Sequence, residues 1–183
     1  SSLKGGGLAK LFYPARIIGL LFCDVPGNQC EQVASGPTYR DDSTVADAKS
    51  VLDKYGITKM ELVETPKDER FFKNVTNIML VSNTAALDAM AEKGKTLGFS
   101  PVILSSALYD APPQIIEKMM KKLDGHDLVL AGGEPSIVVE GSDGSGGRNT
   151  YLAMSAVPHM REGMVFASVG SDGLDNSDAA GGI

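Results

Sequence analysis

Apolar residues gather in short continuous runs along the chain, and stretches with helical spacing separate these runs. The first run, residues 16–24, is apolar almost throughout and ends in an acid, and its branched residues predict a strand buried on both faces. Shorter runs of the same kind predict further strands over residues 77–81, 101–104, 127–131, 136–140 and 164–169.

Between these runs, apolar residues at helical spacing predict helices over residues 43–55, 83–97, 112–123 and 149–157. Ser43 can cap the first helix and Gly56 can end it, and Ser82 and Gly98 can do the same for the second. Strands that alternate with helices at this spacing are typical of an α/β domain with a largely parallel sheet. Ligands of such domains bind outside the carboxyl ends of the strands.

The segment 59–73 interrupts this alternation. It is rich in charged residues, contains Pro66 and shows no regular spacing of apolar residues, so we interpret it as an irregular link and a possible domain boundary. The chain starts at Ser1 without an initiator methionine and stops just after a run of small residues. We therefore expect it to be a piece of a longer protein.

The composition of the chain excludes several classes of protein. The chain is 43% hydrophobic and 22% charged, which excludes wholesale disorder, and its net charge of −6 speaks against nucleic-acid binding. Its apolar runs are too short to span a membrane, and Cys23 and Cys30 make no disulfide framework. We expect a cytoplasmic protein without nucleic-acid or membrane partners. No lysine follows Lys122, so Arg148 and Arg161 are the cations of the last third.

Three candidate positions follow predicted strands. Asp24 ends the first strand and could orient a substrate hydroxyl or hold a metal. The pair Ser35–Gly36 could present backbone N–H groups to an anion. Gly132 and Gly133 would let the backbone pass close to a ligand, and Glu134 could meet a ribose or a metal. An ordinary turn or strand connection remains the alternative at each position.

Two later loops carry the sharpest signals. A glycine-rich loop ending in Gly146–Gly147 leads into the helix that starts near Arg148, and a helix start binds anions through its free N–H groups. A cation at that place is unfavourable unless an anion faces it. Asp172, Asp175 and Asp178 stand three residues apart among glycines and could hold magnesium, although they could also form an acidic surface loop. The chain has no phosphate loop of the G-x-x-x-x-G-K-[ST] type and no dinucleotide fingerprint.

Taken in order, these loops resemble the glycerate kinase family whose C-terminal part is called the MOFRL domain. The resemblance rests on five stretches of the chain. They are residues 4–9 followed by the turn at 13–15; the segment from Asp24 to residues 34–38; residues 82–87; residues 132–134 together with 146–149; and residues 170–173 together with Asp175 and 178–181. It implies that residues 1–70 end a first domain and that 71–183 form most of a second α/β domain, incomplete at its C-terminus. It also implies a site in the cleft between the two domains.

The resemblance implies transfer of the γ-phosphoryl group of ATP to the 2-hydroxyl of D-glycerate, with ATP and Mg²⁺ as cofactors. Asp24 and Arg148 are the expected catalytic residues, and Asp172, Asp175 and Asp178 are the expected metal ligands. The residues expected to bind substrate or phosphate are Ser35, Gly36, Ser82, Asn83, Gly132, Gly133, Glu134, Gly146, Gly147 and Asn149. A homodimer is one oligomeric state to test.

Two alternatives stay open. One is an NAD(P)H-dependent hydroxypyruvate reductase, a name that relatives of this family have carried. It would need the dinucleotide fingerprint that the chain lacks. The other is a non-catalytic module that binds a small molecule. We also expect the 183-residue piece alone to be inactive as a kinase, because the resemblance puts a phosphate-binding lysine in a preceding region.

Overall fold

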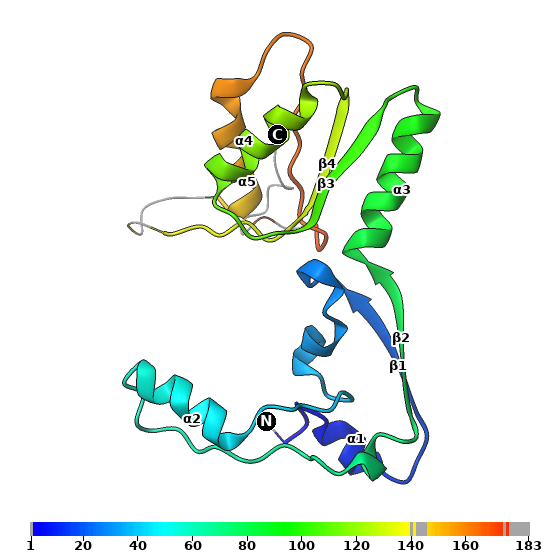
Figure 1. The fold of residues 1–183 in the computed structure, drawn as a ribbon, viewed down its shortest axis with the longest axis vertical. Helices are drawn as coiled ribbons and strands as arrows, with labels where there is room; N and C mark the ends of the chain where they lie inside the picture. The colour runs from blue at the N-terminus through cyan, green and yellow to red at the C-terminus, as the bar shows by residue number, and fades with distance from the viewer. Residues whose placement is uncertain (1, 140, 142–145, 174, 176–183) are drawn as a thin grey trace. The chain divides into compact units, whose positions relative to one another are not determined.

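A computed structural model describes residues 2–139, 141, 146–173 and 175, and it has the expected α/β character (Figure 1). The main elements are α1 (Gly7–Phe12), β1 (Ile17–Cys23), α2 (Val45–Lys54), β2 (Val75–Ser82), α3 (Asn83–Thr96), β3 (Pro101–Leu108), α4 (Pro112–Leu123), β4 (Leu128–Gly133) and α5 (Arg148–Ala156). They form two compact units, the first from Ser1–Val25 and Gln29–Val81 and the second from Pro26–Asn28 and Ser82–Ile183.

The first unit is built around the pair β1–β2. The Ile17 N–H donates to the Asn74 carbonyl at 2.9 Å, which joins the beginnings of the two strands, and Figure 1 shows both strands running in the same direction. The side chains of Ile18, Leu20 and Phe22 are largely exposed, so β1 is not buried on both faces as the sequence predicted. Among the described residues, no element covers this side of the strand.

Helix α2 begins at Val45, two residues after the expected start at residue 43. Thr44, not Ser43, is its N-terminal cap: the Thr44 side chain accepts a hydrogen bond from the Asp47 N–H, and the Asp47 carboxylate accepts one from the Thr44 N–H. The Ser43 hydroxyl donates instead to the carboxylate of Asp41, at 2.7 Å. The hydrogen bond from the Ser43 hydroxyl is the main cause that lowers the pKa of the Asp41 carboxyl below its usual value, although burial acts in the opposite direction.

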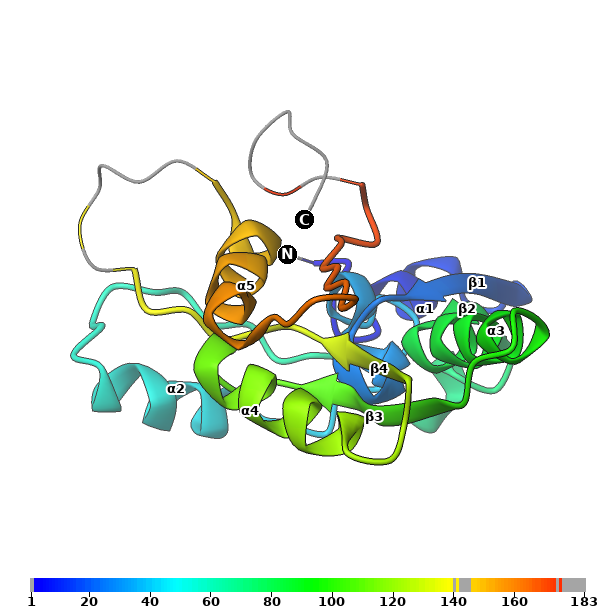
Figure 2. The same ribbon diagram turned by 90° about the horizontal axis from the view of Figure 1, so that it is seen from above.

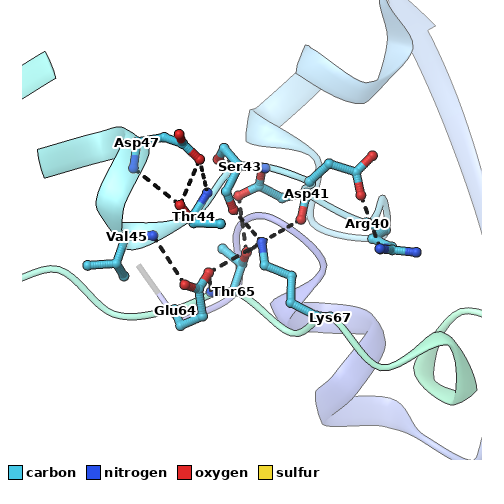
Figure 3. A network of polar contacts seen from close by, with 10 residues as sticks. Arg40, Asp41, Ser43, Thr44, Val45, Asp47, Glu64, Thr65 and Lys67 are labelled. Carbon is cyan, nitrogen blue, oxygen red and sulfur yellow. Dashed lines mark hydrogen bonds and ion pairs between the residues drawn. The ribbon is translucent and has the colours of Figure 1, made fainter. Parts of the chain in front are cut away.

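Lys67 ties the segment before α2 to the predicted link (Figure 3). Its ammonium group donates to the Asp41 carbonyl and the Thr65 hydroxyl, each at 2.6 Å, and also to the Ser43 carbonyl. It lies 3.3 Å from the carboxylate of Glu64, which in turn accepts a hydrogen bond from the Val45 N–H. The irregular link is therefore held in place by one cation with several oxygen partners.

Replacing Lys67 by methionine should lower the free energy of unfolding by about 1 to 2 kcal/mol. The change removes hydrogen bonds from a charged donor while keeping the length of the side chain, and the partial exposure of Lys67 moderates the loss. Urea unfolding of both variants measures the effect, with Lys73→Met as the control because Lys73 is exposed in the same unit. Equal midpoints for the two variants would show that the network adds no stability.

The second unit has three layers. Strands β3 and β4 pair in parallel, with Pro101 opposite Leu128 and Leu108 opposite Gly133. Figures 1 and 2 show α3 on one side of this pair and α4 with α5 on the other. The core between the strands, α4 and α5 consists of the buried residues Leu108, Ile115, Ile116, Leu152 and Ala156.

Two expected strands are absent from the described part of the second unit. Residues 136–139 and 164–169 form no strand, and Glu140 lies outside the described residues. Their valines are largely exposed, as Val138 at 84% and Val165 at 93% show. An apolar run needs a neighbouring strand to pair with, and these two runs have none among the described residues.

Strand β2 pairs with β1 in the first unit, although the sequence grouped residues 77–81 with the second domain.

Candidate functional site

The carboxyl ends of β3 and β4 gather polar groups in the second unit. Residues Pro26–Asn28 pack here beside the start of α3: the Asn28 side-chain amide donates to the Thr84 hydroxyl at 2.9 Å, and the Tyr109 hydroxyl donates to the Pro26 carbonyl at 3.4 Å. The Asn28 side-chain oxygen is buried and has no hydrogen-bond donor among the described residues. The segment that directly follows Asp24 and Val25 is thus part of this site.

Ser82 and Asn83 hold the start of α3 against the sheet. The Ser82 hydroxyl accepts a hydrogen bond from the Ala85 N–H at 3.1 Å, which makes Ser82 the predicted N-terminal cap. The Asn83 side chain donates to the Ser106 carbonyl at 2.6 Å and lies so close to Gly132 that a Cβ atom there would collide with it. Both side chains therefore have structural partners, and Gly132 is needed for this packing.

Glu134 and Arg148, two residues predicted for the site, form an ion pair. The Arg148 guanidinium lies 2.5 Å from the Glu134 carboxylate, and about half of each side chain is exposed. Gly133 places Glu134 there, because its backbone lies directly against Leu108 and the Glu134 N–H donates to the Leu108 carbonyl at 2.7 Å. The anion that the sequence required opposite Arg148 is, in this structure, a carboxylate of the same unit.

The first turn of α5 has an internal anion as well. The Asp175 carboxylate accepts hydrogen bonds from the Asn149 N–H and the Thr150 N–H, each at 2.7 Å, and from the Thr150 hydroxyl. Asp175 is 3% exposed. Gly147 permits this approach, since a Cβ atom on it would collide with the Asp175 backbone. The helix start that the sequence predicted as an anion site is thus filled by a side chain.

Burial alone would raise the pKa of Asp175, but hydrogen bonds from Thr150 and Asn149 outweigh it and lower the pKa from 3.8 to about 2. A carboxylate whose folded pKa is lowered stabilises the fold above its unfolded pKa. We therefore expect about 2 kcal/mol of stability to be lost as the pH falls from about 4 to about 2. Asp175→Asn should lack this contribution, so the stability difference between wild type and variant should shrink over that range. Parallel stability curves from pH 5 to pH 2 would contradict the assignment.

The candidates of the first unit lie on two neighbouring loops. Asp24 is exposed directly after β1. The Ser35 and Gly36 carbonyls accept hydrogen bonds from the Gly5 and Gly6 N–H groups, at 2.9 and 2.8 Å. The Gly36 N–H, which the sequence offered to an anion, donates to the Val33 carbonyl. The loop therefore binds the N-terminal glycine motif through its carbonyls.

Two family models match the chain: Domain of unknown function (DUF4147) over residues 1–65 and the MOFRL family over residues 127–183. The D-glycerate 2-kinase of Thermotoga maritima is 35% identical over all of this chain and 48% of its own length. A crystal structure of glycerate kinase from Thermotoga maritima matches 99% of this chain and 47% of its own with a TM-score of 0.79. The chain is a homologue of the glycerate kinases.

The chain spans about half the length of the glycerate kinases that it matches. A protein of Agrobacterium vitis that carries the name hydroxypyruvate reductase is 32% identical over all of this chain and 53% of its own length. Both names thus occur among the relatives.

Within this glycerate kinase homologue, the described aspartates differ in their surroundings. Asp172 is exposed in a turn closed by a hydrogen bond from the Gly173 N–H to the Gly170 carbonyl at 3.0 Å, whereas Asp175 is buried against α5. Asp178 lies outside the described residues. The described part of the chain holds no group of three or more His, Cys, Asp and Glu side chains placed to bind a metal.

Sequence reasoning missed three residues of this candidate site, namely Asn28, Thr84 and Tyr109. Asn28 has a positive φ of 58°, a conformation that asparagine tolerates better than most residues, and it stands in a Gly-Asn pair typical of a turn. That signal marks the turn but not its packing against α3.

None of the helices in the described residues has the length and apolar composition to cross a membrane.

Proposed function

We propose that the protein containing this chain phosphorylates D-glycerate at its 2-hydroxyl with ATP as the donor. The observation that carries the proposal is the similarity to a D-glycerate 2-kinase along the whole chain. The pairing of Glu134 with Arg148 at the start of α5 supports it, because phosphoryl transfer needs charged groups placed in advance around the phosphates.

Arg148 is the group proposed to bind an anion of the substrates. Its ion pair with Glu134 is about half exposed, and such pairs contribute little stability. An incoming carboxylate or phosphate can therefore replace Glu134 at small cost. The planar guanidinium then donates two parallel hydrogen bonds to the glycerate carboxylate or to the transferred phosphoryl group.

Asp24 is the group proposed to orient the attacking hydroxyl. The 2-hydroxyl oxygen of glycerate forms a bond to the γ-phosphorus, and the bond from that phosphorus to the β,γ-bridging oxygen breaks, so that ADP leaves. The proton of the hydroxyl passes to the Asp24 carboxylate and from there to solvent. The exposure of Asp24 leaves its carboxylate accessible for this role.

Asp172 and Asp175 differ in how well their carboxylates could hold magnesium. Both carboxylate oxygens of Asp175 already accept hydrogen bonds from α5, whereas the exposed Asp172 lies in a glycine-rich turn. Asp172 is therefore the proposed holder of Mg²⁺, directly or through water, and Asp178 stays a candidate from the sequence alone. When bound, Mg²⁺ neutralises charge on the nucleotide phosphates.

Asp172→Asn should raise the Mg²⁺ concentration needed for half-maximal activity, and it should raise the KM for ATP, each about tenfold. The amide keeps the shape of the side chain but removes its negative charge. Titration of Mg²⁺ at fixed glycerate measures the change, with Asp124→Asn as a control because Asp124 is an exposed turn residue of the same unit. An unchanged Mg²⁺ dependence would make this loop a surface turn.

A hydroxypyruvate reductase is the second candidate, because a relative of similar identity carries that name. The two activities are separated by incubating the natural protein with D-glycerate and MgATP, and in parallel with hydroxypyruvate and NADH or NADPH. We expect ADP formation that depends on glycerate and no oxidation of the nicotinamide. Oxidation without ADP would favour the reductase, and ligand binding without turnover in either assay would favour a non-catalytic module.

A further inference from the structure

The anion at the start of α5 belongs to the chain itself. Free N–H groups in the first turn of a helix attract anions, and here those of Asn149 and Thr150 donate to Asp175, 25 to 26 residues further along the chain. The Thr150 hydroxyl donates to the same carboxylate. A phosphate group of a ligand would have to displace Asp175 to reach these donors.

The backbone before α5 lies so close to Asp175 that the Asp175 carboxylate reaches the helix start directly. Gly147, the residue before α5, touches the backbone and the carboxylate of Asp175 and has no room for a side chain. The neighbouring Asn149 side chain is fixed in turn, because its oxygen accepts a hydrogen bond from the buried Ser168 hydroxyl at 2.7 Å. Asp175 and Ser168 thus hold Asn149 from two directions.

These contacts decide where Arg148 stands. Arg148 is the first residue of α5 and lies between Gly147 and Asn149, both of which Asp175 touches. The guanidinium is about half exposed and has one charged partner among the described residues, Glu134. The start of α5 therefore sets where the backbone of Arg148 lies, and Asp175 holds that start.

We propose that Asp175 is a positioning residue for phosphoryl transfer: by occupying the start of α5 it holds Arg148 and Asn149 in their working orientation, and it is not a magnesium ligand. The positioning of the helix start follows from the contacts alone. The link to phosphoryl transfer rests on the proposed kinase function. The proposal also places the bound phosphate away from the backbone N–H groups of α5.

The first experiment measures amide hydrogen exchange by NMR in the natural protein containing this chain, for the wild type, Asp175→Ala and Asp175→Asn. We expect the Asn149 and Thr150 amides to exchange about tenfold faster or more in Asp175→Ala, and by a smaller factor in Asp175→Asn, which keeps one oxygen acceptor. Glu162→Gln is the matched control, since it removes an exposed carboxylate of the same unit. Asp175→Asn preserves the size of the side chain and serves if the alanine variant does not fold.

The second experiment measures glycerate phosphorylation by the natural protein containing the same substitutions. We expect kcat to fall about tenfold or more in Asp175→Asn, while the Mg²⁺ concentration for half-maximal activity changes less than twofold. A merely structural residue would lower the amount of folded enzyme but leave kcat per folded molecule unchanged. A magnesium ligand would instead raise the half-maximal Mg²⁺ concentration, and kcat would recover at saturating Mg²⁺.

Each outcome has a separate meaning. Unchanged exchange of the Asn149 and Thr150 amides in Asp175→Ala would overturn the anchoring role. Faster exchange with an unchanged kcat would overturn the positioning role, as would recovery at high Mg²⁺. If the wild type shows no glycerate phosphorylation at all, the proposed function fails, and the exchange experiment still tests the anchor on its own.

Discussion

Arg148→Lys is expected to lower kcat/KM for glycerate about 10²-fold, or about 3 kcal/mol, while leaving the fold intact. Lysine keeps the positive charge but loses the planar pair of donors that binds a carboxylate or phosphate, and this is the size expected for one preorganised transition-state donor. The fold should tolerate the change because the ion pair with Glu134 is about half exposed. Steady-state kinetics and thermal melting of the natural protein measure the two effects.

Arg161→Lys is the control for that variant. Arg161 is the other cation after Lys122, it is exposed, and it belongs to the same unit. Its replacement should leave kcat/KM within about twofold of the wild type, since surface substitutions away from a site have small effects. Near-normal activity of Arg148→Lys with unchanged melting would mean that Arg148 is a solvated partner of Glu134 without a role in binding.

Asp24→Asn should reduce kcat by about 10²- to 10⁴-fold, the range that a positioned general base contributes. The amide can still orient a hydroxyl by accepting a hydrogen bond, but it cannot take up the proton. Asp24 is exposed, so the loss should occur without a change in stability. Single-turnover kinetics, with enzyme in excess over MgATP and with saturating D-glycerate, separate the chemical step from product release.

Asp53→Asn provides the comparison for Asp24→Asn, because Asp53 is an exposed aspartate of α2 in the same unit. It should retain full activity. A loss below tenfold in Asp24→Asn would show that the proton passes directly to water or to the phosphate, and that Asp24 is a turn residue after β1.

Local signals were enough to predict several elements of the fold. Helix α4 has the predicted bounds, because Pro112 suits a first helical turn and the apolar residues that follow lie on one face of the helix. Helix α3 starts at the residue after Ser82, as its capping side chain predicts. In both cases the information lies within a few residues of the element itself.

Features that depend on distant partners could not be predicted. The apolar runs at 136–140 and 164–169 have the composition of strands, but a strand also needs a neighbour, and none is present in the described residues. The same limit applies to the side of β1 that carries Ile18, Leu20 and Phe22, which the sequence predicted to be buried. A continuous apolar run shows what a strand can bury but not whether a partner covers it.

The loops that carry the candidate site could be predicted from the sequence, but the contacts among their side chains could not. The sequence indicated that Arg148 needs an anion and that a glycine loop precedes a helix, and both features are present. It could not show that Glu134 supplies one anion and Asp175 another. These partners are 14 and 25 or more residues away along the chain, so only the folded structure brings them together.

The most direct test of the proposed function is ³¹P NMR of the product that the natural protein forms from D-glycerate and MgATP. We predict one new phosphomonoester signal, coupled to the single proton on carbon 2, that grows with ADP and requires glycerate. A signal coupled to the two protons on carbon 3 would contradict phosphorylation at the 2-hydroxyl. Release of inorganic phosphate without any phosphoglycerate would contradict the kinase function itself.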